Sequence, residues 1–293
     1  MKNRKNNDII EKIENAKKLG EKMYIENNNR LKELVKYIEK NLTEKIEYKE
    51  LAKILLVNEY TLHRIFYFVT NITLAEYIRK RRLSMAAIDL LEKNTKVLDV
   101  AIKYQYDSGT SFSRAFKKMM GFLPKDIHKN MDNIKYFPIL KFEDISEEQK
   151  ELTFEKVENI SFEFYTIHNH VKMNQISEMA SKFWKDVYKE KGDIFAGNAY
   201  GLVEYNIYDY NENSDVTYYI ASTKKFEGSK KYSIKNKKFL VFEIDTIDGK
   251  QIGKFTHDLY ENFIPYSGDN LDDVPDIEEY IDDKKTKIYI AVI

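Results

Sequence analysis

Two short segments of this chain carry side chains that could hydrogen bond to base edges and hold phosphates. In each segment helical spacing would place these side chains on one face, opposite an apolar stripe. The residues are Tyr60, His63, Arg64 and Tyr67 in the first segment, and Thr110, Ser111, Arg114 and Lys118 in the second. Such donors on the outward face of a short helix are suited to a DNA major groove. The alternative is that both polar faces are simply solvated.

The apolar stripes repeat about fifty residues apart. Leu62, Ile65, Phe66 and Val69 follow the spacing i, i+3, i+4, i+7, and Phe112, Ala115, Phe116 and Met119 repeat it. Each stripe follows a shorter predicted helix and a tight turn, so the pattern is helix, turn, helix, twice. Asn71 and Gly121, both tolerant of left-handed backbone, would end the second helices. Repetition of the whole unit favours base reading over plain solvation.

Charge separates the chain into two halves. Residues 1–130 hold 27 Lys and Arg against 17 Asp and Glu, a net charge of +10, and residues 131–293 hold 21 against 31, a net charge of −10. A basic segment attracts phosphate and an acidic one repels it. The basic half is also the half that contains the repeated helices.

The 293 residues are enough for two domains. We expect an N-terminal arm or extra helix over 1–29, either frayed or used in self-association, and an all-α domain over 30–130. Residues 131–150 contain Pro138 and have no clear period, which predicts a linker. From 151 to 293, β-branched and aromatic runs alternate with amphipathic segments, which predicts an α+β domain.

Several classes of protein are excluded by composition. No run of about 18 apolar residues occurs and the N-terminus mixes acids with bases, so we expect no membrane span or secretory signal, and a cytoplasmic chain. The chain has no cysteine, which excludes disulfides, thiol catalysis and cysteine-ligated zinc, and its five histidines offer few ligands for any other metal site. We therefore predict no metal site and no cofactor.

The α+β half reads as strand, helix, two strands, and then the same set again. We predict a duplicated β-α-β-β unit with two curved sheets side by side and a groove between them. Of the 143 residues from Glu151 onward, 24 are Phe, Tyr or Trp. Aromatic faces beside carboxylates would suit a small apolar or cationic organic ligand. The alternative is that most of these rings are core.

The basic half resembles the DNA-binding domain of AraC-type (AraC/XylS) transcription regulators. The resemblance rests on LAKILLVNEYTLHRIFYFVTNITLAEYIRKRRLSMAAIDLL and VLDVAIKYQYDSGTSFSRAFKKMMGFLPKDI. It implies two helix-turn-helix units on a joining helix over about Leu74–Glu92. It also adds Gly109 to the base-reading set, makes Arg82 a phosphate or structural partner, and implies double-stranded DNA and RNA polymerase as partners, with activation as the outcome.

Two turn positions depart from this family. Leu56 and Gln105 stand where the family usually has glycine. A non-glycine residue in left-handed backbone costs about 1–2 kcal/mol. We therefore expect these two turns to take another shape and to alter the tilt of the helices that follow.

The acidic half is similar to GyrI-like effector-binding domains. Phe183-Trp184, Tyr200-Gly201, ENFIPYSG, IEEY and the closing IYIAVI carry this resemblance. It implies a ligand pocket with a glutamate from an E-x-Y motif, and a response to multiple drugs or toxic compounds. The effector-binding candidates are Glu278, Tyr280, Trp184, Tyr200, Tyr218 and Glu243.

Three functional hypotheses follow. The first is a sequence-specific DNA-binding transcription regulator, not an enzyme, controlled by a small-molecule effector. The second is a GyrI-like hydrolase of reactive small molecules, with Glu278 and Glu243 as acid and base if they share a pocket. The third is a protein that sequesters reactive or toxic small molecules while tethered to DNA, or an architectural DNA binder. Either one keeps both domains but has no regulatory coupling between them. The operator, the effector and the oligomeric state do not follow from the sequence.

Overall fold

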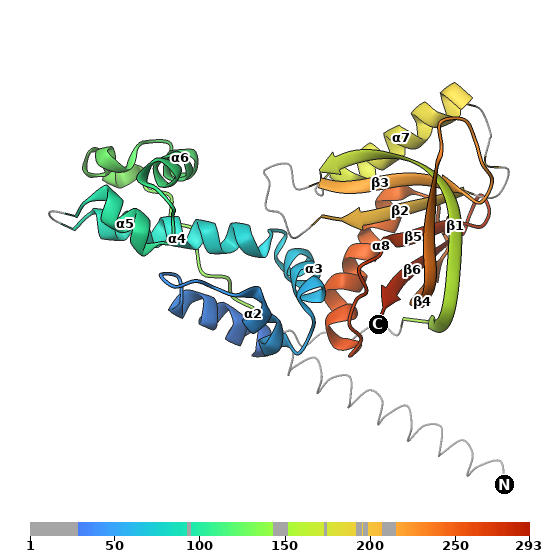
Figure 1. Cartoon of the computed structure of the whole chain (residues 1–293), viewed down its shortest axis with the longest axis horizontal. Coiled ribbons are helices and arrows are strands. Elements are labelled where there is room, and N and C mark those ends of the chain that lie inside the picture. Colours follow the sequence, from blue (N-terminus) through green and yellow to red (C-terminus); the bar gives the residue numbers. More distant parts are fainter. Residues whose placement is uncertain are drawn as a thin grey trace, which may run out of the picture. The chain divides into compact units, whose positions relative to one another are not determined.

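The computed structural model of this chain describes residues 29–92, 95–142, 152–172, 175–191, 195, 199–206 and 215–293 (Figure 1). These residues form two compact units. Unit 1 contains the described residues before His63 and those from 72 to 142. Unit 2 contains His63–Asn71 and the described residues from 152 onward, so the division falls inside helix α3 (Glu59–Thr70). Residues 1–28, most of the predicted arm, lie outside the described residues.

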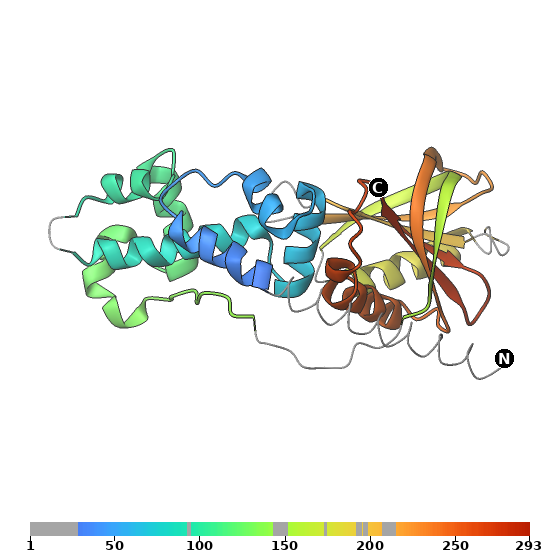
Figure 2. The ribbon, with the colours of Figure 1, turned by 90° about the horizontal axis from the view of Figure 1, so that it is seen from below.

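Unit 1 is all helical in its described part, as predicted (Figure 2). Residues 29–40 form a helix, which is followed by α2 (Tyr48–Leu55), α4 (Leu74–Leu90), α5 (Val97–Lys103) and α6 (Gly109–Met120). The short 3-10 helices η1 (Pro124–Lys129) and η2 (Met131–Asn133) come next. α4 is the predicted joining helix. Its residues Leu83 and Ala87 lie in one core with Phe112 and Phe116 of α6, which fixes α6 on the unit.

The first part of the predicted linker packs against α4. The Phe137 backbone N–H donates to Ser84 Oγ at 2.8 Å, and the Phe137 ring meets the Tyr77 ring edge to face at 6.1 Å. The Arg81 guanidinium donates to the Phe137 carbonyl and also binds Glu39. Residues up to at least Phe137 therefore belong to the packed body of unit 1.

The two turns without glycine keep the left-handed shape. Leu56 has φ 57° and Gln105 has φ 65°. Our expectation that these turns would take another shape was therefore wrong. The Val57 N–H donates to the Ala52 carbonyl and the Tyr106 N–H to the Ala101 carbonyl, so the hydrogen bonds that close each turn hold the strained residue in place. Asn71 (φ 57°) and Gly121 (φ 92°) are left-handed, as predicted.

Six antiparallel strands of unit 2 form a closed barrel in the order β1-β3-β2-β5-β6-β4. Their bounds are β1 Phe154–Lys172, β2 Ala199–Tyr205, β3 Asp215–Ser222, β4 Lys230–Ile244, β5 Asp276–Tyr280 and β6 Thr286–Val292. Helix α7 (Ile176–Lys191) follows β1 and helix α8 (Gly249–Asn262) follows β4. The chain order is therefore strand, helix, strand, strand, twice, which confirms the predicted α+β class and its duplication.

The predicted groove between two sheets does not exist in the described barrel. The interior is filled by an apolar and aromatic core that includes Phe164, Leu202, Phe239 and Ile277. Because every strand pairs on both sides, the sheet has no open seam. The space for a ligand lies instead on the outer face of the barrel, under helices α7 and α8.

Helices α7 and α8 pack against each other at two glycines of α8. A Cβ atom on Gly249 would lie 2.9 Å from Ser181 Oγ, and one on Gly253 would overlap Ser177 Oγ. The absence of side chains at 249 and 253 therefore allows the two helices to approach closely. Asp248 caps α8 by accepting from the backbone N–H groups of Lys250 and Gln251.

Candidate functional site

The outward face of α6 carries the second set of predicted base-reading residues. Thr110, Ser111, Arg114 and Lys118 are exposed, whereas Phe112 and Phe116 are fully buried on the opposite face. Ser108 caps the helix, since its side chain accepts from the Ser111 backbone N–H at 3.1 Å. Gly109 is half-buried at the start of the helix. This arrangement leaves hydrogen-bond donors and two cations on the first three turns, which suits base edges and phosphates.

Arg82 has a structural position in unit 1. Its Nε donates to the Leu42 carbonyl at 2.8 Å and its Nη2 to the Glu44 carbonyl at 2.7 Å. These bonds tie α4 to the loop that precedes α2. Of the two roles that the sequence left open for Arg82, the structure shows the structural one.

The first predicted base-reading set is buried. Tyr60, His63 and Arg64 are 6%, 3% and 1% exposed. Burial lowers the pKa of His63 to about 4, because a protonated imidazole at this buried position would lack the water that stabilises its charge. The expectation that these three side chains face outward is therefore wrong in this structure. Helical periodicity assigned them to a polar face, but it could not show that another segment covers that face.

Arg64 binds a carboxylate of unit 2. Its Nη1 and Nη2 donate to the two carboxylate oxygens of Asp276 at 3.2 and 2.6 Å. The guanidinium carbon lies 4.0 Å from the ring centroid of Tyr205 and 4.1 Å from that of Tyr260. A planar cation between aromatic rings and opposite a carboxylate combines cation–π attraction with a two-point ion pair.

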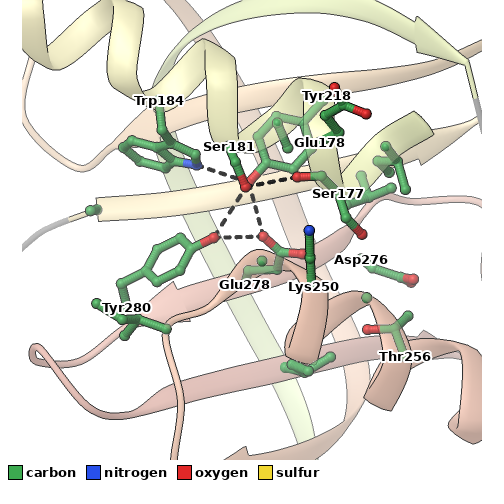
Figure 3. A pocket seen from close by; sticks show the side chains of 18 of the residues that line it. Ser177, Glu178, Ser181, Trp184, Tyr218, Lys250, Thr256, Asp276, Glu278 and Tyr280 are labelled. Atoms are coloured by element: carbon green, nitrogen blue, oxygen red, sulfur yellow. Dashed lines mark hydrogen bonds between the residues drawn. The ribbon is translucent and has the colours of Figure 1, made fainter.

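A cavity of about 1100 Å³ lies in unit 2 (Figure 3). It is lined by α7, α8, the residues Tyr67, Phe68 and Asn71, and the outer faces of the strands. Eight of the 30 lining residues are Phe, Tyr or Trp. Its charged lining residues are five acids and two lysines: Glu178, Asp276, Glu278, Asp282, Asp283, Lys185 and Lys250. The volume exceeds what a drug-sized molecule needs. The lining includes four of the six predicted effector-binding residues, Trp184, Tyr218, Glu278 and Tyr280.

These four side chains form one hydrogen-bonded cluster, which Figure 3 shows. The hydroxyls of Tyr218 and Tyr280 each donate to Glu278 Oε2 at 2.9 Å. Trp184 Nε1 donates to the Tyr218 hydroxyl at 3.0 Å. One carboxylate oxygen thus accepts two phenolic protons, and the indole fixes the orientation of one of these phenols. The cluster thus fixes the Glu278 carboxyl group among the rings of Tyr218, Tyr280 and Trp184 at the cavity wall.

Burial controls protonation in this cluster. Burial raises the pKa of Glu278 above its usual range, although the hydrogen bonds from Tyr280 and Tyr218 act in the opposite direction. The pKa values of Tyr218 and Tyr280 are raised, first by burial and then by the nearby Glu278. Both phenols are therefore neutral donors near neutral pH. A cation that enters the cavity would favour the ionised form of Glu278.

Gly201 makes room for this cluster. It lies on β2 in register with Glu278 of β5. A Cβ atom at 201 would overlap the Tyr218 hydroxyl and lie 2.5 Å from Glu278 Oε2. The hydrogen bond between Tyr218 and Glu278 therefore depends on the absence of a side chain at this position.

Tyr200 and Glu243 were wrongly assigned to the cavity wall. Strand residues alternate between faces, and Gly201 faces the cavity, so Tyr200 points into the barrel, where its hydroxyl donates to Glu279 at 2.9 Å. Glu243 lies on the surface and binds Lys285 at 2.6 Å. Glu278 and Glu243 do not share a pocket, which removes the acid–base pair of the hydrolase hypothesis.

Sequence reasoning missed three residues around the cavity. Asp276, Tyr205 and Tyr260 hold Arg64, and Asp276 and Tyr205 also line the cavity. Strand periodicity could have found two of them. Asp276 is two residues before Glu278 on β5 and Tyr205 is four residues after Gly201 on β2, so each shares a face with a cavity residue.

One group of possible metal ligands occurs among the described residues. The side-chain ligand atoms of His257, Asp258 and Glu261 on α8 lie within 4.8 Å of one another. His257 Nε2 is 3.3 Å from Asn71 Oδ1, and His257 Nδ1 is 3.5 Å from Glu261. Both imidazole nitrogens thus already have polar neighbours. Within the same part of the chain, no helix combines the length and the apolar character needed to cross a bilayer.

A pair of helix-turn-helix units, one with an exposed and basic second helix, defines a DNA-binding protein. The family described as "Helix-turn-helix domain" matches residues 51–130. The transcriptional activator AarP of Providencia stuartii is 37% identical over 94 residues, which cover 32% of this chain and 70% of AarP. The regulatory protein SoxS of Escherichia coli K12 is 31% identical over 96 residues, which cover 33% of this chain and 90% of SoxS.

The chain belongs to the AraC family of helix-turn-helix transcription regulators and is a sequence-specific DNA-binding regulator. A solved structure titled as SAV2435 bound to tetraphenylphosphonium matches 48% of this chain and 94% of its own, with 17% identity and a TM-score of 0.39. A TM-score below 0.5 at this identity assigns no function by itself.

Proposed function

We propose that this regulator is controlled by a small organic effector, cationic or apolar, that binds in the cavity of unit 2. Unit 2 would then serve as a GyrI-like effector-binding domain. The observation that carries the proposal is the Glu278 carboxyl group, which accepts hydrogen bonds from two phenols in a cavity lined by eight aromatic side chains. The effector contacts would come from Glu278, Tyr280, Tyr218 and Trp184.

A cationic effector fits this chemistry better than an anionic one. Ring faces attract cations through their quadrupoles, and a carboxylate removed from water gains more from a counterion than an exposed one does. Asp276 also lines the wall, but Arg64 already balances its charge. Of the other charged lining residues, four are acids and two are lysines, which favours a cation: Glu178, Glu278, Asp282, Asp283, Lys185 and Lys250. An apolar effector without charge would still bury its surface against Trp184 and Phe195.

The DNA contacts are proposed for the exposed face of α6, with Arg114 reading a base and Lys118 holding a phosphate. Thr110, Ser111 and the backbone at Gly109 would complete the contact. Arginine is the side chain suited to a guanine edge, since it forms two parallel hydrogen bonds there. By family resemblance, the outcome would be activation through a contact with RNA polymerase.

Calorimetric titration of the full chain tests the effector proposal. Tetraphenylphosphonium serves as a probe aromatic cation, and neutral triphenylphosphine oxide is the control ligand. We expect the cation to bind and the variant Glu278→Gln to lose about tenfold or more of its affinity, the effect of one lost charge-assisted contact. Glu243→Gln, the same change at a surface position, should bind like the natural chain. Equal binding by all three proteins would contradict the proposal.

A further inference from the structure

Unit 2 contains a second cation site, next to the Glu278 cluster but distinct from it. Its walls are the rings of Tyr205 on β2 and Tyr260 on α8, and its floor is the carboxylate of Asp276 on β5. The Tyr260 hydroxyl donates to both carboxylate oxygens at 3.0 Å, which fixes the carboxylate plane. Asp276 is 2% exposed and Tyr260 is fully buried. The site is thus built to hold a planar cation.

The occupant of this site is the chain's own Arg64. Its guanidinium lies between the two rings and forms the two-point ion pair with Asp276. The segment that carries it is held at further points. The Phe68 ring, one helical turn later, stacks on the Tyr260 ring at 4.3 Å with 16° between planes. Asn71 then meets His257 at 3.3 Å. Residues 64, 68 and 71 therefore lie on one face of the segment, and each of them contacts unit 2 residues of α8 or β5.

Arg64 cannot read DNA while it occupies this site. A guanidinium that binds guanine must offer its two parallel N–H donors to the base edge. In this structure both Nη atoms point to Asp276, and the side chain is 1% exposed. Binding to Asp276 and binding to a base are therefore mutually exclusive states of the same side chain.

We propose that Asp276, Tyr205 and Tyr260 form an internal receptor for Arg64, and that occupation of this receptor withholds Arg64 from DNA. The receptor borders the cavity, since two of its three residues, Asp276 and Tyr205, line it. A cation in the cavity would repel the buried guanidinium and compete for Asp276, so it would favour release of Arg64. This last step rests on the proposed effector function, whereas the receptor itself does not.

Titration of DNA with the full chain, without any small molecule, tests the receptor. The duplex is the best site selected from a random pool by the Asp276→Asn variant, so that it contains the base pair that a released Arg64 would contact. Asp276→Asn keeps the shape of the side chain and removes its charge. We expect it to raise DNA affinity by about tenfold, the value of one two-point guanine contact. Asp273→Asn, the same charge change at an exposed position nearby, should bind DNA like the natural chain.

An Arg64→Ala background shows whether Arg64 is responsible. There, Asp276→Asn should leave DNA affinity unchanged, because no guanidinium remains to be released. If Asp276→Asn does not melt cooperatively, Tyr260→Phe replaces it, since it keeps the ring and removes both hydrogen bonds to Asp276. We expect about a threefold gain from this milder change.

A folded Asp276→Asn or Tyr260→Phe variant whose DNA affinity is unchanged or lower would overturn the receptor. A gain that persists in the Arg64→Ala background would also overturn it. The DNA titration contains no small molecule, so its result does not depend on whether tetraphenylphosphonium binds. Failure of tetraphenylphosphonium to bind would contradict only the effector proposal.

Discussion

Arg64 and Asp276 lie 212 residues apart in the chain and form an ion pair in which both side chains are almost inaccessible to water, with 1% and 3% of their surfaces exposed. Such a pair is costly to break, because removal of one partner leaves a buried charge uncompensated. It joins a helix of the helix-turn-helix motif to a strand that also supplies Glu278. Under the proposed receptor, Asp276 therefore links the stability of unit 2 to the availability of Arg64 for DNA contacts.

Removal of one member of this pair should be more costly than removal of both. We expect Asp276→Leu to lower the free energy of unfolding by about 3 kcal/mol, and Arg64→Leu to lower it by a similar amount. The double variant Arg64→Leu with Asp276→Leu should lose clearly less than the sum, because it leaves no unpaired charge. Urea denaturation of the four proteins measures the coupling. Strictly additive losses would show that the pair is not coupled.

Arg114 and Lys118 should differ in how they affect DNA binding. Arg114→Ala should cost about 1–3 kcal/mol in binding free energy and relax the preference at one base pair. Lys118→Ala should weaken binding to all sequences alike and reduce the salt slope by about 1. Anisotropy titrations against a selected duplex and its single-base variants, at several salt concentrations, separate the two effects. Loss of affinity without any change in base preference in Arg114→Ala would contradict the assignment.

The raised pKa of Glu278 predicts a pH-dependent stability. The folded chain holds the Glu278 proton more tightly than the unfolded chain does, so this group stabilises the fold fully below its ordinary pKa. That stabilisation is lost as pH rises through the raised pKa. The variant Glu278→Gln has no carboxyl group to ionise at this position, so it does not lose this stabilisation as the pH rises. We therefore expect the variant to melt at a higher temperature than the natural chain at pH 8, and at about the same temperature at pH 4.

Thermal melts across this pH range, read by circular dichroism, measure the difference between the two proteins. Glu243→Gln provides the control, since that carboxylate is on the surface and its pKa is lowered by Lys285. A Glu278→Gln variant that is less stable than the natural chain at pH 8 would show that the ionised carboxylate stabilises the fold.

Leu56 should be replaceable by glycine with a gain in stability. Its backbone is left-handed and its side chain is 67% exposed, so the substitution removes strain and little packing. Relief of about 1–2 kcal/mol is partly offset by the larger conformational entropy of glycine in the unfolded chain, about 0.5–1 kcal/mol. We expect a net gain of about 0.5–1 kcal/mol in urea denaturation. Leu98→Gly, at an exposed position inside helix α5, should instead be destabilising.

The helical repeat of unit 1 was predictable because local spacing alone defines it. The stripes of Leu62 and Phe112, the joining helix and the left-handed residues Asn71 and Gly121 all follow from contacts within a few turns. The strands and helices of unit 2 were predictable for the same reason. The turn shape at Leu56 and Gln105 was not, because backbone hydrogen bonds of the whole motif outweigh one residue's preference.

The candidate site was only half predictable. Motif resemblance located Glu278, Tyr280, Tyr218 and Trp184 on the cavity wall, but it also suggested Tyr200, which strand alternation turns to the other face. The burial of Arg64 depends on Asp276, and no local pattern relates two residues so far apart in the chain. Long-range pairing of polar groups is set by the tertiary fold, so only the structure could show it.

Under the proposed effector control, a ligand in the cavity of unit 2 changes DNA binding. The direct measurement is the dissociation constant of the full chain for its selected duplex, with and without saturating tetraphenylphosphonium. We predict that affinity rises by about tenfold with the ligand in the natural chain and does not change in Glu278→Gln. An unchanged dissociation constant in the natural chain, with calorimetry showing that the cation is bound, would contradict the claim.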